Sequence, residues 1–69
     1  MFKIVFVAAV ISLADGADMG QVRLDGTNTY PTEQACQVNL LMRRVELERE
    51  FVKNNMQVAY WVVQRCERQ

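Results

Sequence analysis

The opening stretch of the chain is apolar at nearly every position. Residues 2–14, FKIVFVAAVISLA, contain one charge, at Lys3, and neither Gly nor Pro. β-Branched and aromatic side chains dominate the stretch, and both alternating sets of positions are apolar, whereas a strand with one exposed face alternates with polar residues. We therefore predict a central strand that is buried on both faces.

Two alternatives compete for the same stretch. Lys3, the apolar run and the small residues of Ser12-Leu13-Ala14 also fit a secretory signal with cleavage near Ala14, although about 14 residues is short for a signal. A membrane span needs about 20 apolar residues, and here Asp15 ends the run. We expect no membrane span.

The other strands are predicted from shorter patterns. Residues 15–20 contain two glycines and predict a turn, and residues 21–25 alternate between polar and apolar positions as an edge strand does. Residues 26–29, GTNT, predict a loop. Residues 56–66, rich in valine and aromatic side chains, predict the last strand.

A helix is predicted between these strands. Thr32 can cap it, Pro31 tolerates the missing amide there, and Glu33 suits the positive end of the helix dipole. The helix should run to about Lys53 and end at Asn54-Asn55, since asparagine accepts a left-handed conformation. The chain is thus expected to be one α+β domain over residues 1–69, with element order β-β-α-β. We predict a three-stranded antiparallel sheet of order 2-1-3, with the helix on one face.

Two cysteines stand near the ends of predicted elements. A helix from Cys36 and a returning strand to Cys66 have similar lengths by their rise per residue, so the two ends come level and a disulfide can form. Two buried thiols are the main alternative. A reactive thiol lacks a neighbouring base or a CxxC spacing, and two cysteines without histidine make a poor metal site.

The predicted helix carries two apolar stripes where an ordinary surface helix has one. At 100° per residue, one stripe holds Cys36, Leu40, Leu47 and Phe51. The second, which would point outward if Cys36 meets Cys66, consists of Val38, Leu41, Met42, Val45 and Val52. The alternative is a single broad stripe on a curved or tilted helix, with loops over the back of the sheet.

The predicted last strand also carries apolar residues on both of its faces. Strict alternation from Cys66 puts Val62, Tyr60 and Val58 under the helix. The opposite face would then carry Ala59, Trp61 and Val63. One helix covers one face of a sheet, so we predict that the outer helix stripe and these three residues form interaction surfaces.

The amino-acid composition limits the kinds of catalytic and binding site that the chain can form. The 69 residues carry eight basic and eight acidic side chains, a formal net charge of zero, and no histidine. Nucleic-acid binding normally needs a basic face, so we expect no nucleic-acid partner. The lack of histidine removes the commonest general base and the commonest metal ligand. We find no catalytic, cofactor-binding or metal-binding pattern, and expect a non-enzymatic protein.

The segments YPTEQAC and VAYWVVQRCE, with the apolar opening and acidic turn, resemble a group of small uncharacterised proteins from alphaproteobacteria and their phages. Members pair a cysteine early in the helix with one at the end of the final strand, which Cys36 and Cys66 match. Many also carry two cysteines around the first turn, where this chain has Ile11 and Met19. The resemblance implies an accessory protein of phage or host that acts by binding.

The expected function is therefore that of an interaction or structural protein, which self-associates or joins another protein of an assembly such as a phage particle. One alternative is a small regulator of a host protein, which would use the same surfaces. Another is a secreted disulfide-stapled domain that begins after cleavage near Ala14. The cytoplasm or a phage particle is the favoured location.

Overall fold

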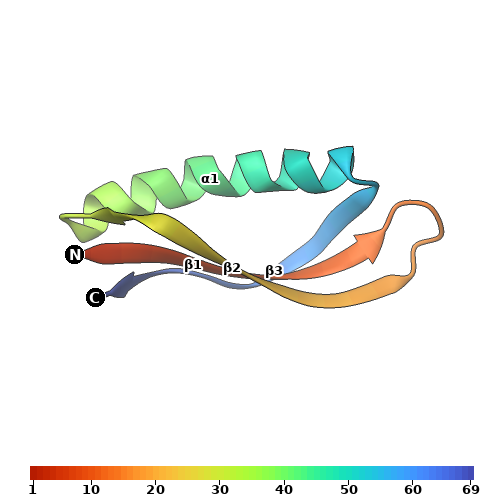
Figure 1. Cartoon of the computed structure of the whole chain (residues 1–69), viewed down its shortest axis with the longest axis horizontal. Helices are drawn as coiled ribbons and strands as arrows, with labels where there is room; N and C mark the ends of the chain where they lie inside the picture. Colours follow the sequence, from red (N-terminus) through yellow and green to blue (C-terminus); the bar gives the residue numbers. More distant parts are fainter.

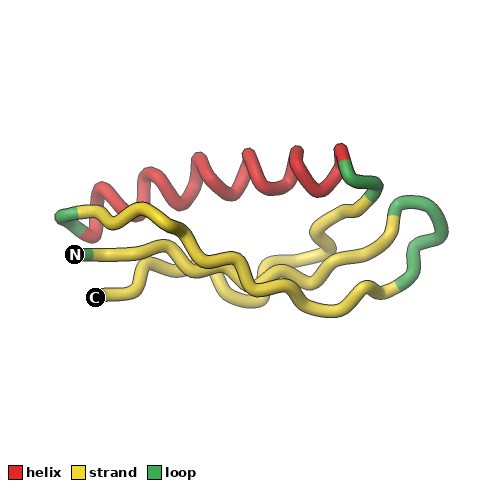
Figure 2. The backbone as a smooth tube through the Cα atoms, in the orientation of Figure 1, coloured by secondary structure: helices red, strands yellow, loops and turns green.

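The computed structural model describes residues 1–69 as a three-stranded antiparallel sheet with one helix along one face (Figure 1). The elements are β1 (Phe2–Ser12), β2 (Asp18–Tyr30), α1 (Glu33–Lys53) and β3 (Met56–Arg68), and the sheet order is β2-β1-β3. The predicted α+β class, element order and strand order are confirmed. The molecule is elongated, 42 × 18 × 16 Å, and both termini lie at one end of it (Figure 2).

β1 is the central strand and supplies most of the buried side chains. Six of the nine buried residues of the chain belong to it, and the other three lie on α1. Ile4 and Phe6 pack against the helix, whereas Val5, on the opposite face, is also fully enclosed. The prediction of a strand buried on both faces is confirmed.

β2 is much longer than the predicted strand over residues 21–25. Residues 26–29, predicted to form a loop, continue the strand, and the turn shortens to residues 13–17. Pairing changes from Lys3 with Thr29 to Val5 with Asp25, so three β2 residues lie opposite Ile4 alone. This bulge absorbs the polar Gly-Thr-Asn segment without breaking the strand. Gly26 lies inside it, where an added Cβ would be 3.3 Å from the Ile4 carbonyl oxygen.

The helix begins and ends where its capping residues predict. The Thr32 side chain accepts a hydrogen bond from the Ala35 backbone N–H at 3.1 Å. At the other end Asn54 is the C-cap, and Asn55 follows with φ of 64°, in the left-handed region. Local chemistry at both ends therefore sets the length of α1.

Thr32→Ala is expected to lower the free energy of unfolding by about 1 kcal/mol, because the N–H of Ala35 loses its side-chain acceptor. Urea unfolding followed by circular dichroism measures the change. Thr32→Ser keeps the acceptor and should retain most of the stability. Equal losses for Thr32→Ala and Thr32→Ser would show that the threonine methyl group, rather than the cap, is responsible.

β3 contains two irregularities that change which side chains face the helix. Its pairing with β1 jumps from Val7–Val63 to Ala8–Trp61, and again from Ala9–Tyr60 to Val10–Val58. Val62 and Ala59 are thus extra residues, and each one reverses the alternation along the strand. Trp61 comes to the helix side, and its ring centroid is 5.0 Å from that of Phe6.

The predicted faces of β3 are therefore partly wrong. Trp61 was expected on the back of the sheet, but it packs against the core under α1. Tyr60 and Val62, expected under the helix, are 61% and 43% exposed. Val58 keeps its predicted side, opposite Val10. The reason is that strict alternation holds only for a strand without bulges.

A disulfide joins the first turn of α1 to the end of β3. The Cα atoms of Cys36 and Cys66 are 6.2 Å apart, and Cys36 is fully buried. The predicted bridge is confirmed, and the free-thiol alternatives are wrong because no cysteine is unpaired. The bridge closes the same end of the domain at which the Gln69 N–H donates to the Met1 carbonyl oxygen. It also fastens the helix to β3 rather than to β2.

Candidate functional site

The outward face of α1 carries more exposed large apolar side chains than any other helix or strand of the molecule. Cys36, Leu40 and Leu47 of the same helix are buried against the sheet, so the opposite side faces solvent. That side carries five large apolar residues, each between 45% and 60% exposed, which we call the outer stripe: Val38, Leu41, Met42, Val45 and Val52. The prediction of a second, outward-pointing stripe is confirmed, and the single broad stripe is wrong.

Charged side chains border the outer stripe and are held by partners in the same chain. Arg43 pairs with Glu46 at 2.9 Å, and Arg44 lies 3.8 Å from Glu48. Arg44 also donates to the Gln64 side chain, and the indole N–H of Trp61 donates to Glu48. The contacts of Arg44 and Glu48 turn these two side chains toward β3, whereas the Arg43–Glu46 pair lies on the side of β2. They leave the apolar side chains of the stripe uncovered.

The back of the sheet is less open than the sequence suggests. Val5 is only 1% exposed, because it lies between Asp25 on β2 and Arg65 on β3. Asp25 is held by an ion pair with Arg23, and Arg65 by one with Glu67. These charged side chains flank the apolar centre of the face. The expected broad apolar surface on this side is therefore much reduced.

The three β3 residues predicted to form an interaction surface do not lie together. Trp61 belongs to the core, and Val63 is half-buried on the back of the sheet, opposite Val7. Ala59 is exposed, at one of the two bulges. The helical part of the predicted surface lies on one face of α1. In the strand part, the bulges at Ala59 and Val62 separate the three residues.

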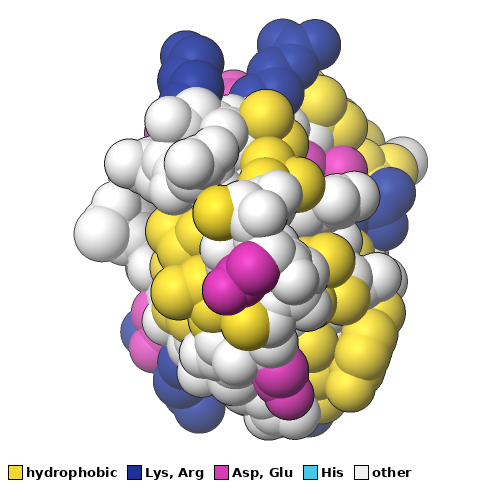
Figure 3. All heavy atoms as spheres, turned by 90° about the vertical axis from the view of Figure 1, so that its right-hand side faces the viewer, with side chains coloured by type: hydrophobic (Ala, Val, Ile, Leu, Met, Phe, Trp, Pro, Cys, Tyr) yellow, Lys and Arg dark blue, Asp and Glu magenta, His cyan; other side chains and the backbone are white.

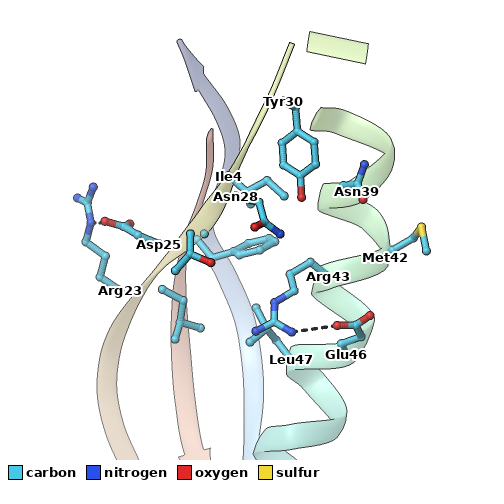
Figure 4. Close-up of a pocket in the computed structure, with 14 residues that line it drawn as sticks. Ile4, Arg23, Asp25, Asn28, Tyr30, Asn39, Met42, Arg43, Glu46 and Leu47 are labelled. Carbon is cyan, nitrogen blue, oxygen red and sulfur yellow. Dashed lines mark hydrogen bonds and ion pairs between the residues drawn. The ribbon is translucent and has the colours of Figure 1, made fainter. Parts of the chain in front are cut away.

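A groove opens between β2 and α1, on the side that the disulfide leaves uncovered. It has a volume of about 590 Å³, and its floor includes Ile4, Phe6 and Leu47. In Figure 4, Tyr30 and Asn28 reach toward it from β2, opposite Asn39 and the Arg43–Glu46 pair on the helix. Sequence patterns do not predict the groove, because residues 26–29 have the pattern of a loop.

Some of the polar groups around this groove are hydrogen-bonded or ion-paired within the protein. Arg43 pairs with Glu46, and the Asn39 amide donates to the Ala35 carbonyl oxygen at 2.8 Å. The Tyr30 hydroxyl and the Asn28 amide make no side-chain hydrogen bond within the protein. The groove offers hydrogen-bonding groups above an apolar floor, without a nucleophile next to a base.

The end of the molecule at the β1–β2 turn also carries apolar side chains. Seen from this end, hydrophobic groups reach the surface between acidic side chains (Figure 3). Leu13 and Met19 are exposed there, next to Asp15 and Asp18, whose carboxylates accept hydrogen bonds from the backbone N–H groups of Ala17 and Gly20.

The structure brings together no group of three or more His, Cys, Asp or Glu side chains that could hold a metal ion. Its helix lacks an apolar segment long enough to cross a membrane. Comparison of the chain with models of protein families, with curated proteins and with solved structures finds no match in any of the three. The resemblance to small alphaproteobacterial and phage proteins therefore stays a prediction.

Proposed function

We propose that this protein is a non-enzymatic interaction protein that self-associates through the outer stripe of α1. The observation that carries the proposal is the exposure of five large apolar side chains on one face of one helix. Single exposed apolar residues are common on monomers, whereas several on one face of one helix indicate an interaction site. The rigid helix holds the set in place, since its other face is buried and bridged to β3.

The balance of charge supports a second copy as the partner. The formal net charge is zero, so two copies approach without net repulsion. Two ion pairs beside the stripe, Arg43–Glu46 and Arg44–Glu48, lie within one chain and persist when the stripe is covered. Covering the stripe therefore removes apolar area from water without stripping a buried charge of its partner.

Val45→Lys is expected to weaken self-association at least tenfold. It places an ammonium in the middle of the stripe, where a second copy would have to desolvate it. The matched control is Val62→Lys, because Val62 is 43% exposed and Val45 is 45% exposed, but Val62 lies on β3 away from the stripe. Sedimentation velocity over a range of protein concentrations measures the change.

Two results would contradict the proposal. If the wild-type chain stays monomeric at high concentration, the proposed self-association is wrong. If Val45→Lys and Val62→Lys have equal effects, the outer stripe is not the site of self-association. Stoichiometric co-purification of one host protein with a monomeric chain would support the alternative of a host-protein regulator. If that host protein no longer co-purifies with the Val45→Lys variant, it binds to the same stripe.

A further inference from the structure

We propose that two copies pair their α1 helices antiparallel across a two-fold axis close to Val45, with Val38 of each copy beside Val52 of the other. This inference rests on the proposed self-association and specifies its geometry. The outer stripe runs from Val38 to Val52, and Val45 is its midpoint. Full overlap of two antiparallel stripes therefore brings each end of one against the opposite end of the other.

The spacing of the stripe points to another helix as its partner. Val38, Val45 and Val52 follow one another at intervals of seven residues, and Leu41 and Met42 fill the position between the first two. Apolar residues with this repeat form the seam along which two helices pack. The stripe spans about 21 Å at 1.5 Å per residue, which is most of the length of α1.

Charge decides between the two possible orientations. The place between Val45 and Val52 is occupied by Glu48 and Arg49 instead of apolar residues. In a parallel pair, Glu48 would face Glu48 and Arg49 would face Arg49 of the other copy, and such like-charge contacts are unfavourable. In the antiparallel pair these two residues lie opposite Met42 and Leu41, whose apolar side chains can pack on the aliphatic stem of Arg49.

The fold leaves room for this arrangement. The sheet lies entirely on the other side of α1 (Figure 1), so two copies would stack as sheet, helix, helix and sheet. The contact uses the same patch on both copies and is therefore closed, without a leftover apolar stripe that could recruit a third copy. A dimer, not an open polymer, is the expected product.

Cysteine cross-linking separates the two orientations. The variants Val38→Cys and Val52→Cys each add one free thiol, since the two native cysteines are paired with each other. Each variant is oxidised alone and as an equimolar mixture. We expect the mixed Val38→Cys/Val52→Cys dimer to exceed either self-linked dimer at least tenfold. Intact mass after alkylation checks that the native bridge remains, and Val62→Cys serves as the exposed control away from the stripe.

Each outcome bears on a different claim. Dominant self-linked dimers of Val38→Cys and of Val52→Cys would overturn the antiparallel orientation while leaving self-association intact. A wild-type chain that sediments as a monomer, without stripe-specific cross-links, would overturn the proposed function itself.

As a second measurement, spin labels at position 38 should lie about 21 Å apart along the helix direction in the antiparallel dimer, and side by side in a parallel one.

Discussion

A chain that begins at Asp15 is expected to lose its folded structure completely. Residues 1–14 include all of β1, to which both β2 and β3 are hydrogen-bonded, and six of the nine buried residues. Without β1 the other two strands have no pairing partner between them, and the inner face of α1 loses Ile4 and Phe6. What remains cannot bury enough apolar area to offset the conformational entropy of folding.

Circular dichroism and amide chemical-shift dispersion measure this loss. The truncated chain should show neither a cooperative thermal transition nor dispersed amide resonances. The control is a chain without Gln69, which loses only the terminal hydrogen bond to Met1 and should fold. Cooperative folding of the chain from Asp15 would contradict the role given to β1, and would favour a secreted domain that begins after Ala14.

Replacing Cys36 and Cys66 together by alanine is expected to lower the free energy of unfolding by about 3–4 kcal/mol. The bridge spans 30 residues, and a closed loop of that size restricts the unfolded chain by this amount in the chain-entropy model. The loss is large for this chain, because domains of this size bury only about 60% of their unfolded surface.

Urea unfolding of the oxidised wild type, the reduced wild type and the double variant measures the contribution of the bridge. The reduced wild type and the double variant should agree closely, apart from the volume lost where Cys36 is buried. A loss below about 1 kcal/mol in both would mean that the unfolded chain already holds the two ends together.

Variants that loosen the fold can be distinguished from variants that change only the outer stripe. The bridge orients α1 by its first turn, so its removal loosens the helix at the end that carries Val38. Val45→Lys, by contrast, changes an exposed position and should leave the free energy of unfolding of the monomer almost unchanged. Comparison of the two variants therefore distinguishes loss of fold from loss of contact.

Features that depend on neighbouring residues and on hydrophobic periodicity are predictable from the amino-acid sequence alone. β1 was predictable because both of its alternating faces are apolar, and α1 because Thr32 and the two asparagines after Lys53 act within a single turn of backbone. The outward stripe followed from helical geometry once Cys36 was placed against Cys66. None of these predictions depends on the register in which one strand pairs with another.

Which side chains of β2 and β3 lie on which face of the sheet depends on how the strands pair in the folded chain. The bulges at Ala59 and Val62 exist because β3 pairs with β1 in a particular register, and they move Trp61 into the core and Tyr60 out of it. The bulge beside Ile4 likewise keeps residues 26–29 in β2 and forms one wall of the groove. Strand register depends on pairing between residues distant in sequence, which local patterns do not contain.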